Sequence, residues 1–290
     1  MCIEQKRTVR IRQKHQGSCY RNATRGDEHK VNTARCGSAC MIDAKDTPAV
    51  FIRTLGAFEV IRDGTPVPRA VWQSKKARDL LKILIARRKA TSREQLVDFL
   101  WPEIHRAKGG NRLSVLLWTL RNVLQPHANA GPLASDGSAV WLDRNQANVD
   151  VDKFLTDAVA ALAAHRGGQP DAAERLRTAI TAYTGNFLEE DAAQDWAISL
   201  AEEVRVTHIA LLRGLAARLR HTGDIDEAIR YLLQLLGQDP FDEQAHLDLI
   251  NMQLGAGHLG EARRHYHIYV QQMKEIDVHP QPLPLERRRK

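Results

Sequence analysis

The stretch Phe51–Arg144 decides the fold, and its centre reads SKKARDLLKILIARRKATSREQLVDFLWP at 74–102, LSVLLWTLRNVL at 113–124 and LASDGSAVWL at 133–142. Leucine and isoleucine recur at helical spacing in the first two segments, which predicts amphipathic helices. In the third segment Asp136-Gly137 lies between two short apolar runs, as in a β-hairpin. Strands, three helices and a hairpin in this order predict a winged helix-turn-helix, a fold whose third helix enters a DNA major groove.

Strand-forming residues, capping residues, terminal cations and a proline indicate where the elements before the third helix begin and end. β-branched and aromatic residues at 50–55 and 58–61 predict two short strands. We expect the first helix to open at Trp72 and to close at 87–89, where three cations suit the negative helix end. Thr91 or Ser92 is suited to cap the second helix, which Pro102 stops.

The third helix is expected after a break at Gly109-Gly110 and before Pro126. Its buried stripe is predicted to consist of five leucines, namely Leu113, Leu116, Leu117, Leu120 and Leu124. We expect Trp118 to complete the core against the wing. The alternative for this side chain is stacking on a sugar or contact with a thymine methyl group.

From Asp150 onward the sequence predicts helices throughout. The expected stretches are 152–166, 170–183, 191–221, 225–236, 243–255 and 259–274. Gly223–Ala228 recurs as Gly257–Ala262, an offset of 34 residues, which is the period of tetratricopeptide repeats. A weaker echo at 168–173 indicates an earlier hairpin of the same kind.

Basic side chains are unevenly distributed. Residues 1–40 hold nine Lys or Arg and three Asp or Glu, a net charge of +6, and residues 41–47 hold one basic and two acidic residues, a net charge of −1. Residues 48–150 hold sixteen basic and nine acidic residues, a net charge of +7. Residues 151–290 hold sixteen basic and twenty-one acidic residues, a net charge of −5. The expected winged helix is therefore basic by itself, whereas phosphate would repel the C-terminal half. No apolar run approaches the roughly 20 residues of a membrane span. The N-terminus also lacks a secretory signal, so we expect a cytoplasmic protein without membrane contact.

All four cysteines, Cys2, Cys19, Cys36 and Cys40, lie in a polar, basic segment without helical or strand periodicity. This composition predicts a disordered tail over 1–47, with Met41 as an alternative start of the natural protein. A metal site on Cys36 and Cys40 is the competing interpretation, but the paired spacing of metal clusters is missing. We expect no metal and no cofactor, and a second basic, flexible tail over 279–290.

Candidate DNA contacts lie on the third helix and around it. Arg112 and Asn122 are suited to read base edges, because arginine pairs with guanine and asparagine with adenine. Cations at the start of the first helix and before the third are suited to hold phosphate. The predicted contacts are Lys75, Lys76, Arg106, Lys108, Asn111, Arg112, Ser114, Thr119, Arg121, Asn122, Ser138 and Arg144. Arg78 is a further phosphate candidate, and Ser138 and Arg144 are the candidates on the wing. The competing interpretation of Arg112 and Asn122 is a solvated helix face, and that of Arg121 is internal pairing.

Three motifs carry a resemblance to a known family. They are SKKARDLL at 74–81, SREQL at 92–96 with LWP at 100–102, and Leu120-Arg121 with Leu124. With the repeats behind them, residues 50–275 resemble the SARP regulators, which pair a response-regulator-type winged helix with a bacterial transcriptional activator domain. The resemblance implies binding to direct repeats in promoter DNA and contact with RNA polymerase. No G-x-x-x-x-G-K-[ST] loop is present, so the chain resembles the small members that lack an ATPase domain.

The predicted fold class is mostly α with a small β component: a winged helix-turn-helix domain at 48–148, then an all-α, tetratricopeptide-like helical-hairpin domain at 149–278. The predicted function is that of a sequence-specific regulator, an activator rather than a repressor, which binds double-stranded promoter DNA, contacts RNA polymerase and is compatible with a homodimer on DNA. The alternative is a tetratricopeptide-type interaction scaffold whose degenerate winged helix binds DNA weakly. Because the sequence has no recognisable catalytic frame, we do not expect an enzyme.

Overall fold

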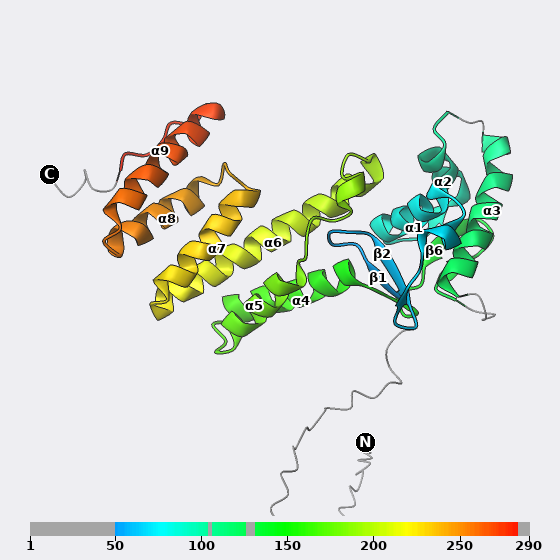
Figure 1. The fold of residues 1–290 in the computed structure, drawn as a ribbon, viewed down its shortest axis with the longest axis horizontal. Helices are drawn as coiled ribbons and strands as arrows, with labels where there is room; N and C mark the ends of the chain where they lie inside the picture. The colour runs from blue at the N-terminus through cyan, green and yellow to red at the C-terminus, as the bar shows by residue number, and fades with distance from the viewer. Residues whose placement is uncertain (1–49, 104–105, 126–130, 284–290) are drawn as a thin grey trace, which may run out of the picture. The chain divides into compact units, whose positions relative to one another are not determined.

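A computed structural model describes residues 50–103, 106–125 and 131–283, and for residues 106–108 it describes the backbone alone. The predicted N-terminal tail, with its four cysteines and Met41, and residues 284–290 of the C-terminal tail lie outside the described residues. Asp46–Lys290 forms one compact unit, in which a small α/β part precedes the helices α4–α9 (Figure 1). Within the described ranges no helix is long and apolar enough to cross a membrane.

The first sheet has the strand order β3-β2-β1-β7. β1 (Val50–Arg53) runs antiparallel to β2 (Glu59–Arg62), which pairs with β3 (Thr65–Pro66), and the two predicted strands are thereby confirmed. β7 (Ala147–Val149) joins the other side of β1 in parallel. The sequence did not predict β7, because a three-residue strand has no recognisable period and its partner lies almost a hundred residues earlier.

Three helices follow the first strands. α1 (Lys75–Arg87) is capped by Ser74, whose Oγ accepts from the backbone N–H of Lys76 at 3.1 Å. α2 (Arg93–Leu100) is capped by Ser92, as predicted. The expected start of the first helix at Trp72 is wrong. Trp72 ends a separate 3-10 turn, η1 (Arg69–Trp72), and Gln73 then adopts a left-handed conformation that a helix cannot continue.

α3 (Arg106–Leu124) runs through both glycines, so the expected break at Gly109-Gly110 is also wrong. A Cβ atom at position 109 would lie 2.2 Å from Cγ1 of Val97. Glycine therefore serves the close approach of α3 to α2, although it lowers helix propensity by about 1 kcal/mol. The five predicted leucines are buried, but the prediction of Trp118 as a core residue is wrong, because 58% of this residue is exposed.

The wing is confirmed. β5 (Leu133–Ser135) and β6 (Ala139–Leu142) form an antiparallel hairpin in which Leu133 pairs with Leu142. β4 (Thr91–Ser92) adds a third strand beside β6. The short strand at the start of α2 therefore ties the helices to the wing.

The remaining elements are helical hairpins, as predicted. They are α4 (Asp150–Arg166), α5 (Ala172–Ala182), α6 (Asp195–Thr222), α7 (Ile225–Gln238), α8 (Glu243–Gly255) and α9 (Leu259–Glu275), with the 3-10 turn η2 (Glu189–Asp191) before α6. Gly223 and Gly257 both adopt positive φ angles, and α7 and α9 begin two residues after them, which preserves the 34-residue offset. Ala228 and Ala262 are fully buried where each of these helices packs on the preceding one.

The winged helix and helices α4–α7 share one hydrophobic core that reaches α8, and a second cluster of Ile250, Tyr269 and Met273 lies between α8 and α9. The carboxylate of Asp150, at the start of α4, accepts from the backbone N–H groups of Thr54 at 2.8 Å and Leu55 at 3.0 Å. Lys82 of α1 forms an ion pair with Asp191 of η2, and their side chains are only 4% and 11% exposed. The two parts are thus joined by buried polar contacts as well as by apolar packing.

Candidate nucleic-acid interface

The outward side of α3 is the centre of the candidate interface. Its buried side carries the leucines, and its exposed residues are Asn111, Arg112, Ser114, Val115, Trp118 and Arg121, which we call the recognition face. The nineteen residues of α3 include no Asp or Glu. An acid-free helix with two exposed arginines is suited to the negative potential of a DNA groove.

Ser114 is fixed on this face by two hydrogen bonds. Its Oγ accepts from a guanidinium nitrogen of Arg93 at 2.8 Å and donates to the carbonyl oxygen of Gly110 at 3.1 Å. Arg93 is the first residue of α2, and its backbone N–H donates to the carbonyl oxygen of Ser138 in the wing at 3.0 Å. Sequence reasoning missed Arg93, because no local pattern places it beside α3.

The wing lies next to the C-terminal half of α3. The guanidinium of Arg121 donates to Oγ of Ser135 at 3.3 Å. At the turn, the carboxylate of Asp136 accepts from the backbone N–H groups of Ala139 and Ser138 and from the Ser138 hydroxyl, and these bonds lower the pKa of Asp136. Ser138 is therefore exposed on the wing, with its hydroxyl engaged in holding the turn.

Two further predicted contacts sit near the end of α3. Asn122 is half-buried, and the guanidinium of Arg62 donates to the carbonyl oxygens of Asn122 and of Val123. The expectation for Thr119 must be corrected. This residue is 3% exposed and belongs to the buried side of the helix, so it does not present its hydroxyl to a base edge.

A hollow of about 330 Å³ at the start of α1 brings cations together. Arg69, Lys75 and Arg78 line it, next to the Ser74 cap. Among the described residues none of these three cations has an acidic partner within ion-pair distance, whereas Lys76 approaches Asp79 at 3.9 Å. Of the three, Arg69 was missed by sequence reasoning. The hollow also lies at the positive end of the α1 dipole, which suits it to a phosphate oxygen.

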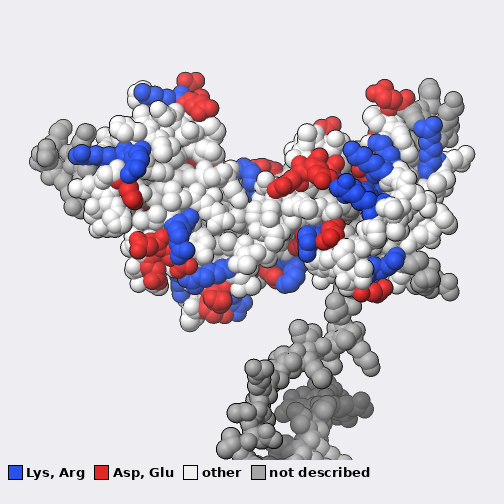
Figure 2. All heavy atoms as spheres, in the orientation of Figure 1, with Lys and Arg blue, Asp and Glu red and all other residues white. Residues whose placement is uncertain are grey.

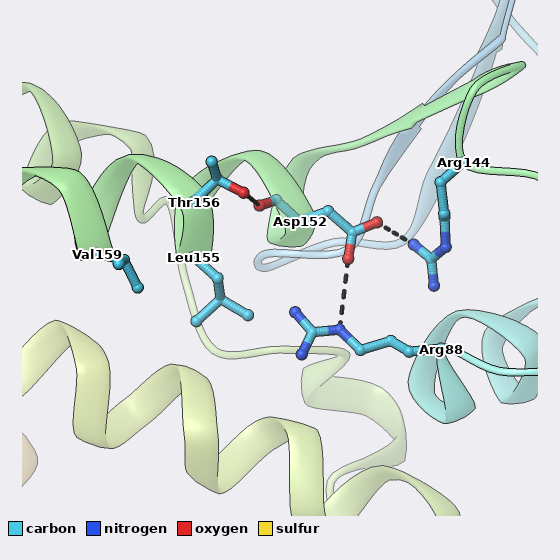
Figure 3. Close-up of a pocket in the computed structure, with 6 residues that line it drawn as sticks. All are labelled: Arg88, Arg144, Asp152, Leu155, Thr156 and Val159. Atoms are coloured by element: carbon cyan, nitrogen blue, oxygen red, sulfur yellow. Dashed lines mark hydrogen bonds and ion pairs between the residues drawn. The ribbon is translucent and has the colours of Figure 1, made fainter. Parts of the chain in front are cut away.

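Three predicted contacts remain, namely Arg106, Lys108 and Arg144. The side chains of Arg106 and Lys108 lie outside the described residues. Arg144 pairs with Asp152 and donates to the carbonyl oxygen of Ile85 at 2.9 Å, so it closes the C-terminal end of α1. Arg144 and Arg88 converge on Asp152 beside a hollow of about 590 Å³ (Figure 3). Burial lowers the pKa of Arg144.

Figure 2 shows groups of Lys and Arg side chains over the winged helix with a few Asp and Glu side chains beside them, and mixed basic and acidic side chains over the hairpins of the C-terminal half. This distribution follows the charges of +7 for residues 48–150 and −5 for residues 151–290. The basic part of the surface therefore coincides with the part of the fold that carries the recognition face.

Comparison with known proteins bears on both parts. The fold is similar to that of Mycobacterium tuberculosis EmbR, solved in complex with a low affinity phosphopeptide, with a TM-score of 0.65 and 21% identity. The family of the bacterial transcriptional activator domain matches residues 149–287. The chain combines a winged domain with a bacterial transcriptional activator domain, as the SARP resemblance implies. The resemblance drawn from the sequence motifs is thereby confirmed.

The two similarities differ in extent. The EmbR match covers 81% of this chain but 62% of that chain, so the chain spans less than two thirds of its neighbour's length. At this identity the likeness shows the fold, a winged domain followed by tetratricopeptide-like helices. No curated protein matches by sequence. The activator-domain match is what ties the C-terminal half to transcription regulation.

Proposed function

We propose that this chain is a sequence-specific DNA-binding regulator that activates transcription. The recognition face of α3 enters the major groove, the wing meets the adjacent backbone, and the activator domain contacts RNA polymerase or another partner protein. The single observation that carries the proposal is the acid-free recognition face, with Asn111, Arg112 and Arg121 exposed on a helix whose opposite side is fully packed. Asn and Arg are the side chains that read adenine and guanine edges with two hydrogen bonds.

Phosphate contacts are available on both sides of this helix. The cation hollow of Arg69, Lys75 and Arg78 lies at the start of α1, and η1, which contributes Arg69, packs against α3. On the other side, Arg93 and Arg121 connect α3 to the base and the strand of the wing. Contacts of this kind place a protein on the duplex, and base contacts then specify the sequence.

The activator domain is suited to a protein partner. Residues 151–290 carry a net charge of −5, which disfavours a second DNA contact. The buried ion pair between Lys82 and Asp191 and the bonds of Asp150 to β1 join this domain to the winged helix. A partner bound to the helical hairpins would therefore be held in a defined position relative to the promoter.

The experiment that tests the proposal is selection of bound sequences from a random pool of double-stranded DNA with the full chain. We expect a motif repeated at about one helical turn, as two copies on one face of the duplex require. Arg112→Ala should lower affinity for this motif by about 1–3 kcal/mol and relax one position of it. The matched control is Arg264→Ala, an exposed arginine on α9, which should recover the same motif.

A scaffold function is the competing outcome. If no motif is recovered and all binding disappears near physiological salt, the winged helix does not read DNA, and partner binding by the helical hairpins becomes the leading function. If a motif is recovered equally well by wild type and Arg112→Ala, the chain binds DNA, but not through the recognition face.

A further inference from the structure

Two large apolar side chains occupy the middle of the recognition face. Val115 is 61% exposed and Trp118 is 58% exposed. At about 100° per residue, the positions of Asn111, Val115, Trp118 and Asn122 fall within an arc of about 60° on the side of α3 opposite the leucines. Val115 and Trp118 therefore point away from the core, and Asn111 and Asn122 lie beyond them along the same line.

The charges around Val115 and Trp118 favour one class of binding partner. Arg112 and Arg121 flank it on the two sides of the arc, α3 holds no acidic residue, and residues 48–150 carry a net charge of +7. Two apolar side chains between two arginines are suited to a partner surface that is negatively charged and carries apolar groups at its centre. The major groove of DNA is such a surface, because thymine places a C5-methyl group among the hydrogen-bonding edges of the bases.

The spacing also fits. Residues three apart on a helix are separated by about 4.5 Å along its axis, close to the 3.4 Å step between successive bases of one strand. Val115 and Trp118 are neighbours at this spacing, so they can contact the methyl groups of adjacent base pairs. Arg112, another three residues earlier, can pair with a guanine next to them.

We propose that Val115 and Trp118 determine specificity by contacting thymine C5-methyl groups in the major groove, in a site where guanine is read by Arg112. This inference rests on the proposed function and names the base that the apolar centre of the recognition face selects. Ser114 is held by Arg93 on the edge of the same face.

The test uses the full chain and duplexes of the selected motif in which individual thymines are replaced by deoxyuridine, which lacks only the C5-methyl group. Wild type should lose about fourfold in affinity for each contacted methyl group removed, from the transfer free energy of one methyl. Trp118→Ala and Val115→Ser should bind the thymine duplex more weakly and should no longer distinguish thymine from deoxyuridine at one position each. Trp118→Phe, which keeps an apolar face, should retain the discrimination.

The controls separate this inference from the proposed function. Arg112→Ala should weaken binding but keep the thymine preference, and Ile268→Ala, an exposed apolar residue of α9, should change neither. One outcome overturns the inference and leaves the proposed function standing. In that outcome a motif that depends on Arg112 is recovered, but wild type binds the thymine and deoxyuridine duplexes equally well. Unchanged discrimination in Trp118→Ala and Val115→Ser also overturns it, because other side chains would then read the methyl groups. Failure to select any motif overturns both.

Discussion

The guanidinium of Arg93 donates to Oγ of Ser114 at 2.8 Å and so joins the first residue of α2 to the outward side of α3. The backbone N–H of Arg93 donates to the carbonyl oxygen of Ser138 in the wing. One residue thus connects the two helices of the helix-turn-helix and the wing. In a winged helix these are the parts that must keep a fixed spacing to meet groove and backbone together.

Replacing Arg93 should therefore reduce specific binding, because α2, α3 and the wing are no longer held at a fixed spacing. Arg93→Ala and Arg93→Lys should each lower affinity for the selected motif by about fivefold, because a charge-assisted bond at a partly exposed site contributes about 1 kcal/mol. Arg93→Lys should keep the salt dependence of wild type, since the charge is retained. Titrations of motif and random duplexes at several salt concentrations measure both quantities. Wild-type affinity in Arg93→Lys would show that Arg93 acts only as a charge.

The cation hollow makes a different prediction. Lys75→Ala and Arg69→Ala should weaken binding to all sequences by a similar factor, because phosphate contacts carry no base information. Each lost contact should reduce the slope of log affinity against log salt by about 0.9. The control is again Arg264→Ala. If these variants lose affinity for the motif but not for other sequences, and the slope of log affinity against log salt is unchanged, Lys75 and Arg69 contact base edges instead.

The sequence predicted those features that depend on local periodicity. The leucine stripe of α3, the Asp136-Gly137 hairpin and the 34-residue offset between α7 and α9 each repeat at a spacing that one element imposes by itself. The break expected at Gly109 failed for a reason outside that helix, namely the side chain of Val97 against which the glycine packs. Helix propensity cannot show such a contact.

The candidate site was predictable to a similar degree. The basic residues of the recognition face could be found from the helix period. Thr119 was misplaced, because it is 3% exposed although the helix period places it next to exposed Arg112. Trp118 was expected to complete the core against the wing, although its angular position opposite the leucines indicated exposure. Arg144 was assigned to the wing, but its partners Asp152 and Ile85 come from α4 and α1. Such long-range pairing has no signature in a single sequence.

The buried ion pair between α1 and η2 predicts how the parts depend on one another. Lys82→Met leaves the carboxylate of Asp191 without its partner and should lower the free energy of unfolding by about 3–5 kcal/mol. Lys82→Met combined with Asp191→Leu should recover most of this loss, because no uncompensated charge remains. Urea denaturation followed by circular dichroism measures both.

A matched control for this pair is available on the surface. Lys153 and Asp157 form an exposed ion pair on α4 with side chains 65% and 40% exposed, and Lys153→Met should change stability by less than about 1 kcal/mol. We also expect the winged helix and helices α4–α7 to unfold in a single transition in all these variants, since they share one core. Two separate transitions in the Lys82 variant alone would mean that this pair is what makes unfolding cooperative.

The last prediction concerns acid, and it follows from a histidine pair in the hairpin of α8 and α9. Nε2 of His265 lies 3.1 Å from Nδ1 of buried His246, whose Nε2 lies 2.8 Å from the carbonyl oxygen of Pro240. Because that carbonyl only accepts, His246 carries its proton on Nε2, and its Nδ1 accepts from His265. Glu243 and Tyr269 complete the surroundings, joined by a 2.7 Å hydrogen bond from the Tyr269 hydroxyl.

Burial, with His246 nearby, lowers the pKa of His265 from 6.5 to about 4. Between these two values the unfolded chain binds more protons than the folded chain, so the free energy of unfolding should fall as the pH drops from about 6.5 to 4, by at most about 3 kcal/mol. His208, whose pKa burial also lowers, adds to the same trend. His265→Gln should flatten the dependence, whereas His267→Gln, an exposed histidine of the same helix, should leave it as in wild type. An equal slope in His265→Gln and wild type, measured by urea denaturation at pH 7, 6, 5 and 4, would contradict the assignment and place the acid sensitivity at other groups such as His208 and His165, whose pKa burial also lowers.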